Sequence, residues 1–105
     1  MIGGDLNTNR LPTGPGALAA ILDDPSGVEP LFRSLREAGF DWRTVNTTDA
    51  TQRTRPDGTP RPPFNRIDWL AVRGVRGMAP RTIAAVDDSG QAISDHELIV
   101  ADITF

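Results

Sequence analysis

Cysteine and lysine are both absent from this chain of 105 residues. Without cysteine the chain forms neither a disulfide nor a thiolate metal site, and its redox compartment cannot be inferred from cysteine usage. Without lysine, all 11 basic side chains are arginine, which we attribute to genomic base composition rather than to function. No apolar run approaches the roughly 20 residues that a membrane-spanning helix needs. The first residues have neither the basic nor the apolar region of a signal peptide.

The residues that are present are typical of a soluble folded domain. Hydrophobic residues make up 38% of the chain and charged residues 24%, a balance that argues against a disordered segment. The length fits one domain with a small core. A formal net charge of −3 disfavours tight non-specific binding of nucleic acid, because that affinity rests largely on neutralising phosphates. A locally basic groove is still compatible with this charge.

Hydrophobic spacing predicts both helices and strands. Leu31, Leu35 and Ala38 recur at helical spacing, between Pro30 at the start and Gly39 at the end, and this pattern predicts a helix with a buried stripe. We expect helices over 17–22 and 30–38, and strands over 1–6, 67–73, 81–86 and 98–105, with a turn at 87–90. This order of elements predicts an α/β or α+β layer.

Two further regions bear on the fold. The last expected strand is apolar on both faces, with Ile99 and Ile103 on one and Leu98 and Val100 on the other, which predicts a sheet covered on both sides. The segment 40–65 is polar and rich in threonine, arginine and proline. We expect it to be a long loop, and loops of this length in a small domain are usually functional or disordered.

The first polar cluster follows the expected opening strand and spans residues 3–8, with the sequence Gly-Gly-Asp-Leu-Asn-Thr. Glycines there allow a tight turn and the close approach of a ligand. Asp5 and Asn7 are two residues apart, so in an extended chain their side chains face the same way. Together they offer a base or metal ligand beside a hydrogen-bond donor. The alternative is an ordinary turn, which Asp and Asn after glycine favour.

The second and third clusters lie at the starts of later strands. Asp68 shares a strand face with Leu70 and Val72, and a carboxylate on an apolar face needs a partner. That partner is either an imidazole or an arginine such as Arg66. His96, the one histidine of the chain, follows Ser-Asp just before the last strand. It is either structural or a group that changes charge near neutral pH, in which case Asp68 would orient its ring as in a catalytic triad.

The three clusters, taken in order, carry a resemblance. Gly-Asp-Leu-Asn at 4–7, Arg-Ile-Asp-Trp at 66–69 and Ser-Asp-His at 94–96 resemble the C-terminal motifs of the endonuclease/exonuclease/phosphatase superfamily, the DNase I-like hydrolases. The resemblance covers essentially the whole chain. It implies a single partial domain over 1–105, half of a four-layer α/β sandwich, with one mixed but mainly antiparallel sheet and two helices on one face. It also implies hydrolysis of a phosphodiester or phosphomonoester, nuclease activity included.

Residue by residue, the resemblance implies that Asp5 orients or deprotonates the attacking water and that Asn7 binds the phosphate. His96 would bind a phosphate oxygen and stabilise the transition state, and Asp68 would orient His96. Phosphoester hydrolysis requires such an activated water and stabilised oxygens. Thr8 and Ser94, which complete two of the motifs, are expected to support the local backbone.

The resemblance also implies a divalent metal, Mg²⁺ or Mn²⁺, with Asp5 and Asp95 among its ligands. The family domain is longer than this chain, and its N-terminal half supplies an Asn and the main metal-binding Glu. We therefore expect the chain to be part of a larger enzyme and to be inactive or very weak alone. Its uncovered sheet face would be closed by the N-terminal half or by self-association. The alternatives are a non-catalytic half-domain that serves as a binding or assembly module, and a structural fragment.

Arginine is concentrated in and after the polar segment. Five arginines occur there: Arg43, Arg53, Arg55, Arg61 and Arg66. Guanidinium groups match phosphate well, but a solvated loop explains the first four better. We expect only Arg66, which is close to Asp68, to bind substrate phosphate. Trp42 and Trp69 are expected in the core. The sequence does not distinguish DNA, RNA, inositol phosphates and lipid phosphodiesters as substrates, although the acidic balance disfavours generic DNA cleavage.

Overall fold

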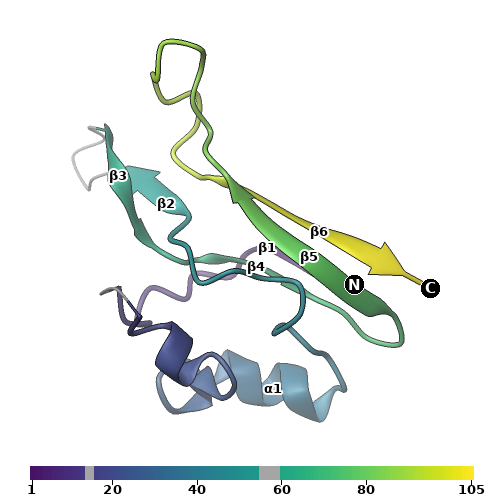
Figure 1. Cartoon of the computed structure of the whole chain (residues 1–105). Coiled ribbons are helices and arrows are strands. Elements are labelled where there is room, and N and C mark those ends of the chain that lie inside the picture. Colours follow the sequence, from purple (N-terminus) through teal and green to yellow (C-terminus); the bar gives the residue numbers. More distant parts are fainter. Residues whose placement is uncertain (14–15, 55–59) are drawn as a thin grey trace.

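The chain forms an α+β fold in the computed structural model, which describes residues 1–13, 16–54 and 60–105 (Figure 1). The elements in chain order are β1 (Ile2–Asp5), η1 (Ala19–Ile21), η2 (Pro25–Gly27), α1 (Leu31–Glu37), β2 (Gln52–Thr54), β3 (Pro60–Asn65), β4 (Asp68–Ala71), β5 (Arg76–Ile83) and β6 (Leu98–Thr104). The strands pair antiparallel as β1–β4, β2–β3 and β5–β6. No helix in the described ranges is long and apolar enough to cross a membrane.

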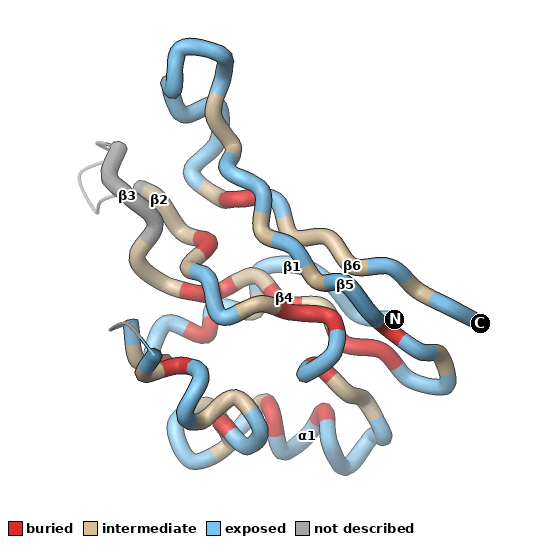
Figure 2. Tube along the Cα trace, viewed as in Figure 1, coloured by how far each residue is buried: buried red, intermediate tan, exposed pale blue. Residues whose placement is uncertain are grey.

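The core lies between α1 and the β1–β4 pair, where buried residues concentrate (Figure 2). Phe32 of α1 is fully buried and meets Trp42 and Trp69 edge-on, with ring centroids 5.1 and 4.9 Å apart. Such edge-to-face contacts are favourable for aromatic pairs. The other buried members of this cluster are Leu11, Leu18, Leu35 and Ala71. Both tryptophans therefore lie in the core, as the sequence predicts.

Helix α1 agrees with the helix predicted over 30–38. Leu35 is buried, and Leu31 packs against the same cluster. Gly39 follows with a φ of +80°, a conformation that glycine adopts freely and that ends many helices. The helix predicted over 17–22 is only a single 3₁₀ turn, η1. An isolated helix of that length lacks enough hydrogen bonds to be stable.

The prediction of one sheet with two helices on one face is wrong for the described residues, which form three two-stranded sheets and one α-helix. The prediction that 40–65 is all loop is also wrong, because β2 and β3 lie within it. Isolated bridges join the pieces: Asp41 pairs with Val72, and Gln52 pairs with His96. Threonine, arginine and proline gave this segment no alternation by which its strands could be recognised.

Strand β5 begins at Arg76, earlier than the predicted 81. Its register shifts between Met78 and Arg81, and Ala79 has a φ of 49°. This irregularity, next to Pro80, breaks the alternation expected of a strand. The predictions of a turn at 87–90 and of a last strand over 98–105 are confirmed, the latter as β6.

The β5–β6 hairpin lies across β4 from α1 (Figure 1). Its inner side is packed: a side chain at Gly77 would overlap Val45, and Thr82 shares a hydrogen bond with Thr47 at 2.6 Å. On its outer side the paired residues Ile83 and Leu98 are 46% and 56% exposed. The prediction that this sheet is covered on both faces is therefore wrong for the described residues. They cover only the inner face of the hairpin.

Candidate functional site

Strand pairing brings the first two motifs together. In the β1–β4 ladder Gly4 lies opposite Trp69, and Asp5 lies opposite Asp68. Residues directly opposite one another in an antiparallel pair have Cβ atoms about 5 Å apart. Two carboxylates therefore end the ladder side by side, an arrangement that is unfavourable unless a cation or a proton donor lies nearby.

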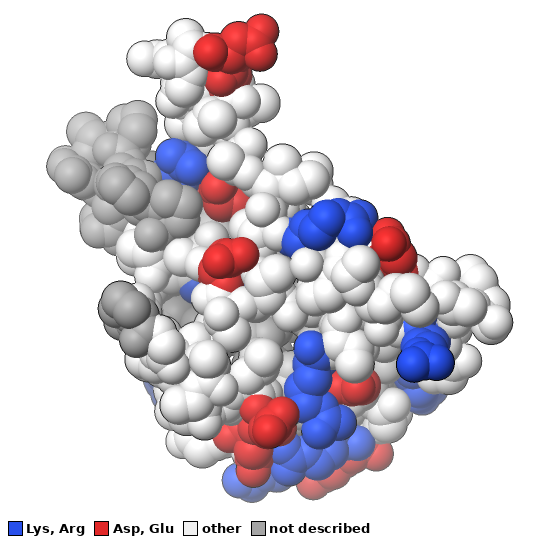
Figure 3. Space-filling view, viewed as in Figure 1, with Lys and Arg blue, Asp and Glu red and all other residues white. Residues whose placement is uncertain are grey.

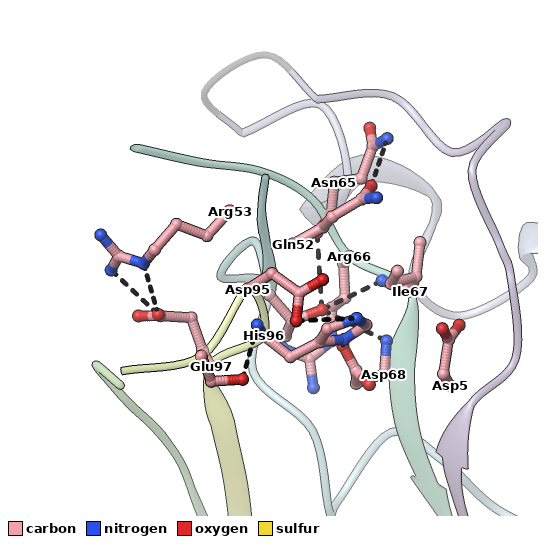
Figure 4. Close-up of polar contacts among 12 residues, drawn as sticks. Asp5, Gln52, Arg53, Asn65, Arg66, Ile67, Asp68, Asp95, His96 and Glu97 are labelled. Atoms are coloured by element: carbon pink, nitrogen blue, oxygen red, sulfur yellow. Dashed lines mark hydrogen bonds and ion pairs between the residues drawn. The ribbon is translucent and has the colours of Figure 1, made fainter. Parts of the chain in front are cut away.

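His96 brings the third motif to the same place (Figure 4). Its Nδ1 lies 2.8 Å from Asp68 Oδ2, and its backbone N–H donates to Ser94 Oγ at 3.1 Å. The two side chains are largely covered, at 31% exposure for His96 and 13% for Asp68. The structure thus gives Asp68 a histidine partner, which the sequence left open between an imidazole and an arginine.

The acidic surroundings favour the protonated form of His96. The hydrogen bond to Asp68 is the main cause of a raised pKa, and the charges of Asp95 and Asp5 act in the same direction. Partial burial opposes them. With Nδ1 donating to Asp68, Nε2 is the second donor of the ring. It lies 4.0 Å from Asp95 Oδ1, too far for a hydrogen bond, so it is available to an external acceptor.

Asn7 lies in a tight turn after β1. Its φ is 55°, and its backbone N–H donates to Asp5 Oδ1 at 2.9 Å. Asparagine tolerates this left-handed conformation better than most residues. The expectation that Asp5 and Asn7 lie in extended chain is therefore wrong, and the turn is present. A role of the two exposed side chains in chemistry stays a prediction.

Thr8 links the first motif to the second. Its buried hydroxyl donates to the carbonyl of Arg66 at 2.7 Å and accepts from Trp69 Nε1 at 2.7 Å. The supporting role expected of Thr8 is confirmed by these contacts. The hydroxyl fixes the distance between the turn that carries Asn7 and the strand that carries Asp68.

Thr51 is a site residue that the sequence reasoning missed. Its fully buried hydroxyl accepts from the backbone N–H groups of Ile67 and Asp68, at 3.1 and 3.2 Å. It thereby holds the point where Asp68 enters β4. Thr51 also accepts through its carbonyl from Glu97 N, next to His96. No sequence signal marks it, because it is one of several threonines in a polar segment.

An ion pair beside His96 was also missed. Arg53 lies 2.9 Å from Glu97, and the carboxylate is 5% exposed. Glu97 additionally accepts from the backbone N–H of Ala85 at 3.2 Å. The buried carboxylate thus has three N–H donors, two from Arg53 and one from Ala85. These contacts join β2 to the start of β6 and so help to place the His96 ring.

Arg66 is buried, and its guanidinium forms hydrogen bonds with residues other than Asp68 and His96. The guanidinium donates to Asn46 Oδ1 at 3.0 Å and to the carbonyl of Asp49 at 2.9 Å. It also lies over the Trp69 ring, 5.0 Å from the centroid. The ion pair with Asp68 that the sequence offered as an alternative is not formed. A contact of Arg66 with substrate phosphate stays a prediction.

The predicted metal ligands are close to the histidine but few in number. Asp95 is 60% exposed, and Asp5 is at the end of β1. Across the described residues, no three or more His, Cys, Asp or Glu side chains are grouped so that they could hold a metal ion. On the face shown in Figure 3, basic side chains gather at the lower end, with acidic side chains next to them.

Protein-family models, curated proteins and solved structures were each compared with the chain, and none of the three comparisons finds a match.

Proposed function

We propose that this chain forms the C-terminal part of a divalent-metal-dependent phosphoesterase of the endonuclease/exonuclease/phosphatase type. The observation that carries the proposal is the meeting of three motifs, distant in sequence, at one point. Asp5 lies opposite Asp68 across a strand pair, and Asp68 accepts a hydrogen bond from His96. On this proposal the described layers are half of a four-layer sandwich.

His96 is the proposed group that binds the phosphate. Asp68 holds Nδ1 and so fixes the ring and its protonation, which leaves Nε2 to donate to a phosphate oxygen. A fixed donor of this kind stabilises charge that develops on the oxygen in the transition state. The raised pKa of His96 favours the doubly protonated ring that this role needs.

Asp5 and Asn7 are the proposed water-activating and phosphate-binding groups. Asp5 would accept a proton from the attacking water, and the Asn7 amide would donate to a phosphate oxygen. Asp5 is at the end of β1, opposite Asp68 and near enough to His96 to raise its pKa. Asn7 follows in the turn whose N–H binds Asp5, and both side chains are exposed. Arg66 is assigned no contact with the scissile phosphate, because its donors lie on the Asn46 and Asp49 side.

The carboxylates of Asp5 and Asp95 fit Mg²⁺ or Mn²⁺ by donor chemistry, since these hard cations prefer oxygen ligands and often use only one or two carboxylates. The described residues do not group three ligands, so a further ligand from outside them is part of the proposal, the family's glutamate. A bound metal would supply positive charge next to the phosphate oxygens.

The proposed partner is the N-terminal half of the family domain, and a second copy of the chain is the alternative. The exposed outer side of the β5–β6 hairpin, with Met78, Ile83 and Leu98 each more than 40% exposed, supports a covering partner. The substrate is a phosphoester. The formal net charge of −3 supports a small or specific substrate over generic DNA.

The test is hydrolysis of a chromogenic phosphodiester by the intact protein with Mg²⁺, with and without EDTA. Asp5→Ala and His96→Ala are each expected to lower kcat by a factor of about 10² to 10⁴, and EDTA is expected to abolish activity. Glu37→Ala removes an exposed carboxylate of α1 and serves as the matched control with unchanged rate. Full activity in both site variants would end the proposal. The 105-residue chain alone is expected to be inactive.

A non-catalytic binding or assembly module is the second candidate. It is favoured by the small number of grouped metal ligands and by the open side of the hairpin. An intact protein that hydrolyses no phosphoester, with association that Leu98→Asp abolishes, would support it over the enzyme.

A further inference from the structure

Arg66 is a buried cation that forms no ion pair with the residues the structure describes. It is 3% exposed, and its acceptors are all neutral oxygens: those of Asn46, the Asp49 backbone and, at longer distance, the hydroxyls of Thr47 and Thr82. Burial lowers its pKa to about 10, although the more distant charges of Asp49 and Asp68 oppose this. A buried charge without a close counter-charge is costly. No carboxylate among the described residues forms an ion pair with this guanidinium.

The Nε of Arg66 is also without an acceptor. It is the only buried side-chain nitrogen or oxygen in the described part of the chain that has no hydrogen-bond partner. Buried polar atoms without a partner are rare in folded proteins, and a bound ligand is one explanation of them. The other guanidinium nitrogens are already held by Asn46 and Asp49, so the group is fixed in place and its buried Nε–H is unpaired.

A recess adjoins this arginine. The recess is open to solvent, and Arg66 lines it with the hydroxyl-bearing Thr13 and Thr48 and the apolar Leu18 and Phe64. Asp5, Asp68 and His96 do not line it. The recess is therefore separate from the candidate catalytic site. Its described lining residues carry one positive charge, two hydroxyl groups and no carboxylate.

We propose that this recess binds one phosphate-sized oxyanion, through Arg66 and the hydroxyls of Thr13 and Thr48. Hydrogen bonds from a charged donor to an anion are among the strongest in proteins, and the anion would supply the counter-charge that Arg66 lacks. The Trp69 ring under the guanidinium, 5.0 Å away, keeps the group in position. This binding does not depend on phosphoesterase activity.

The experiment is an NMR titration of the 105-residue chain with inorganic phosphate at constant ionic strength, with chloride as the reference salt. Saturable shifts are expected in the Arg66 Nε–H resonance and in the amides of Thr13 and Thr48. A parallel titration uses glycerol 3-phosphate. Equal binding of the two assigns the site to free phosphate, and tighter binding of the ester assigns it to the phosphate group of a larger ligand.

Two variants make the result specific. Thr48→Val replaces an exposed hydroxyl with a methyl group of the same shape and is expected to weaken binding about tenfold. Arg81→Gln removes an exposed arginine that does not line the recess and is expected to leave binding unchanged. Absence of saturation, or equal effects of the two variants, would overturn the proposal. So would phosphate shifts confined to Asp5, Asn7 and His96, an outcome that would support the catalytic site instead.

Discussion

The two sides of strand β4 are built differently. On the α1 side, Phe32 and Trp69 are fully buried against each other. On the other side, the β5–β6 hairpin exposes Ile83 and Leu98 to about half their surface. The hairpin is tied to the rest by polar contacts, above all those of His96 and Glu97. Hydrophobic burial therefore stabilises one side, whereas directional contacts place the other, and those contacts belong to the candidate site.

The largest expected loss of stability comes from removing a buried ring on the α1 side of β4. Phe32→Ala removes a fully buried ring that contacts both tryptophans, and a buried Phe→Ala change costs about 3–5 kcal/mol. A core of this size has little stability to spare. Urea unfolding, followed by tryptophan fluorescence, measures the loss.

Ile83→Ala on the hairpin is the matched comparison, because it removes an exposed apolar side chain. Its cost is expected to be below about 1 kcal/mol. If the two variants lost equal stability, the hairpin would be part of the core, and the contrast between the two sides would be wrong.

The second largest expected loss of stability concerns the two hydrogen bonds of the buried Thr8 hydroxyl on the α1 side. Thr8→Val keeps the shape of the side chain but leaves Trp69 Nε1 without its acceptor and the Arg66 carbonyl without a donor. A buried unsatisfied group costs about 1–3 kcal/mol, which the shift in the urea midpoint reports. Thr104→Val, on exposed β6, is the control and is expected to change nothing measurable. An equal loss in both would rule out the buried hydrogen bonds as its cause.

The third effect is a pH dependence at the junction of the two sides. The pKa of His96 is raised, first by the hydrogen bond to Asp68. A raised pKa in the folded state means that the pair contributes its full stability below the unfolded value of about 6.5. The contribution is lost as the pH rises through the folded pKa. The stability difference between wild type and Asp68→Asn is therefore expected to be larger at about pH 5.5 than at about pH 8.5.

His96 is the one histidine, so its ring resonances give its pKa directly. Asp68→Asn is expected to lower this pKa most, and Asp95→Asn less, in the order of their contributions. A His96 pKa that Asp68→Asn leaves unchanged would contradict the contact. A larger fall in Asp95→Asn would mean that the ring faces Asp95 instead.

The sequence predicted the parts of the fold whose signal is local. The helical stripe of Leu35 and its neighbours ended at Gly39, and β6 followed its apolar run. Motif order placed Asp68 and His96 as candidates before any contact was known. These features are readable because period and capping depend on residues within a few positions of each other.

The rest depends on contacts between distant segments. Thr51 acts on the backbone of Asp68 from 17 positions away, and nothing near Thr51 marks it. The sequence also does not predict the partner of Arg66. Its closeness to Asp68 in the sequence favours an ion pair, but in the structure the guanidinium donates to Asn46. Tertiary packing overrides such local expectations.

The smallest expected effect lies on the outer side of the hairpin, where Arg81 and Asp102 form an ion pair at 3.1 Å. Both side chains are about half exposed, so water and salt screen their attraction. A double-mutant cycle of Arg81→Gln and Asp102→Asn is expected to give a coupling below about 1 kcal/mol that declines with added salt. A larger coupling that resists salt would mean that a partner covers this side in solution. In the 105-residue chain that partner would be a second copy, which is the alternative to the N-terminal half.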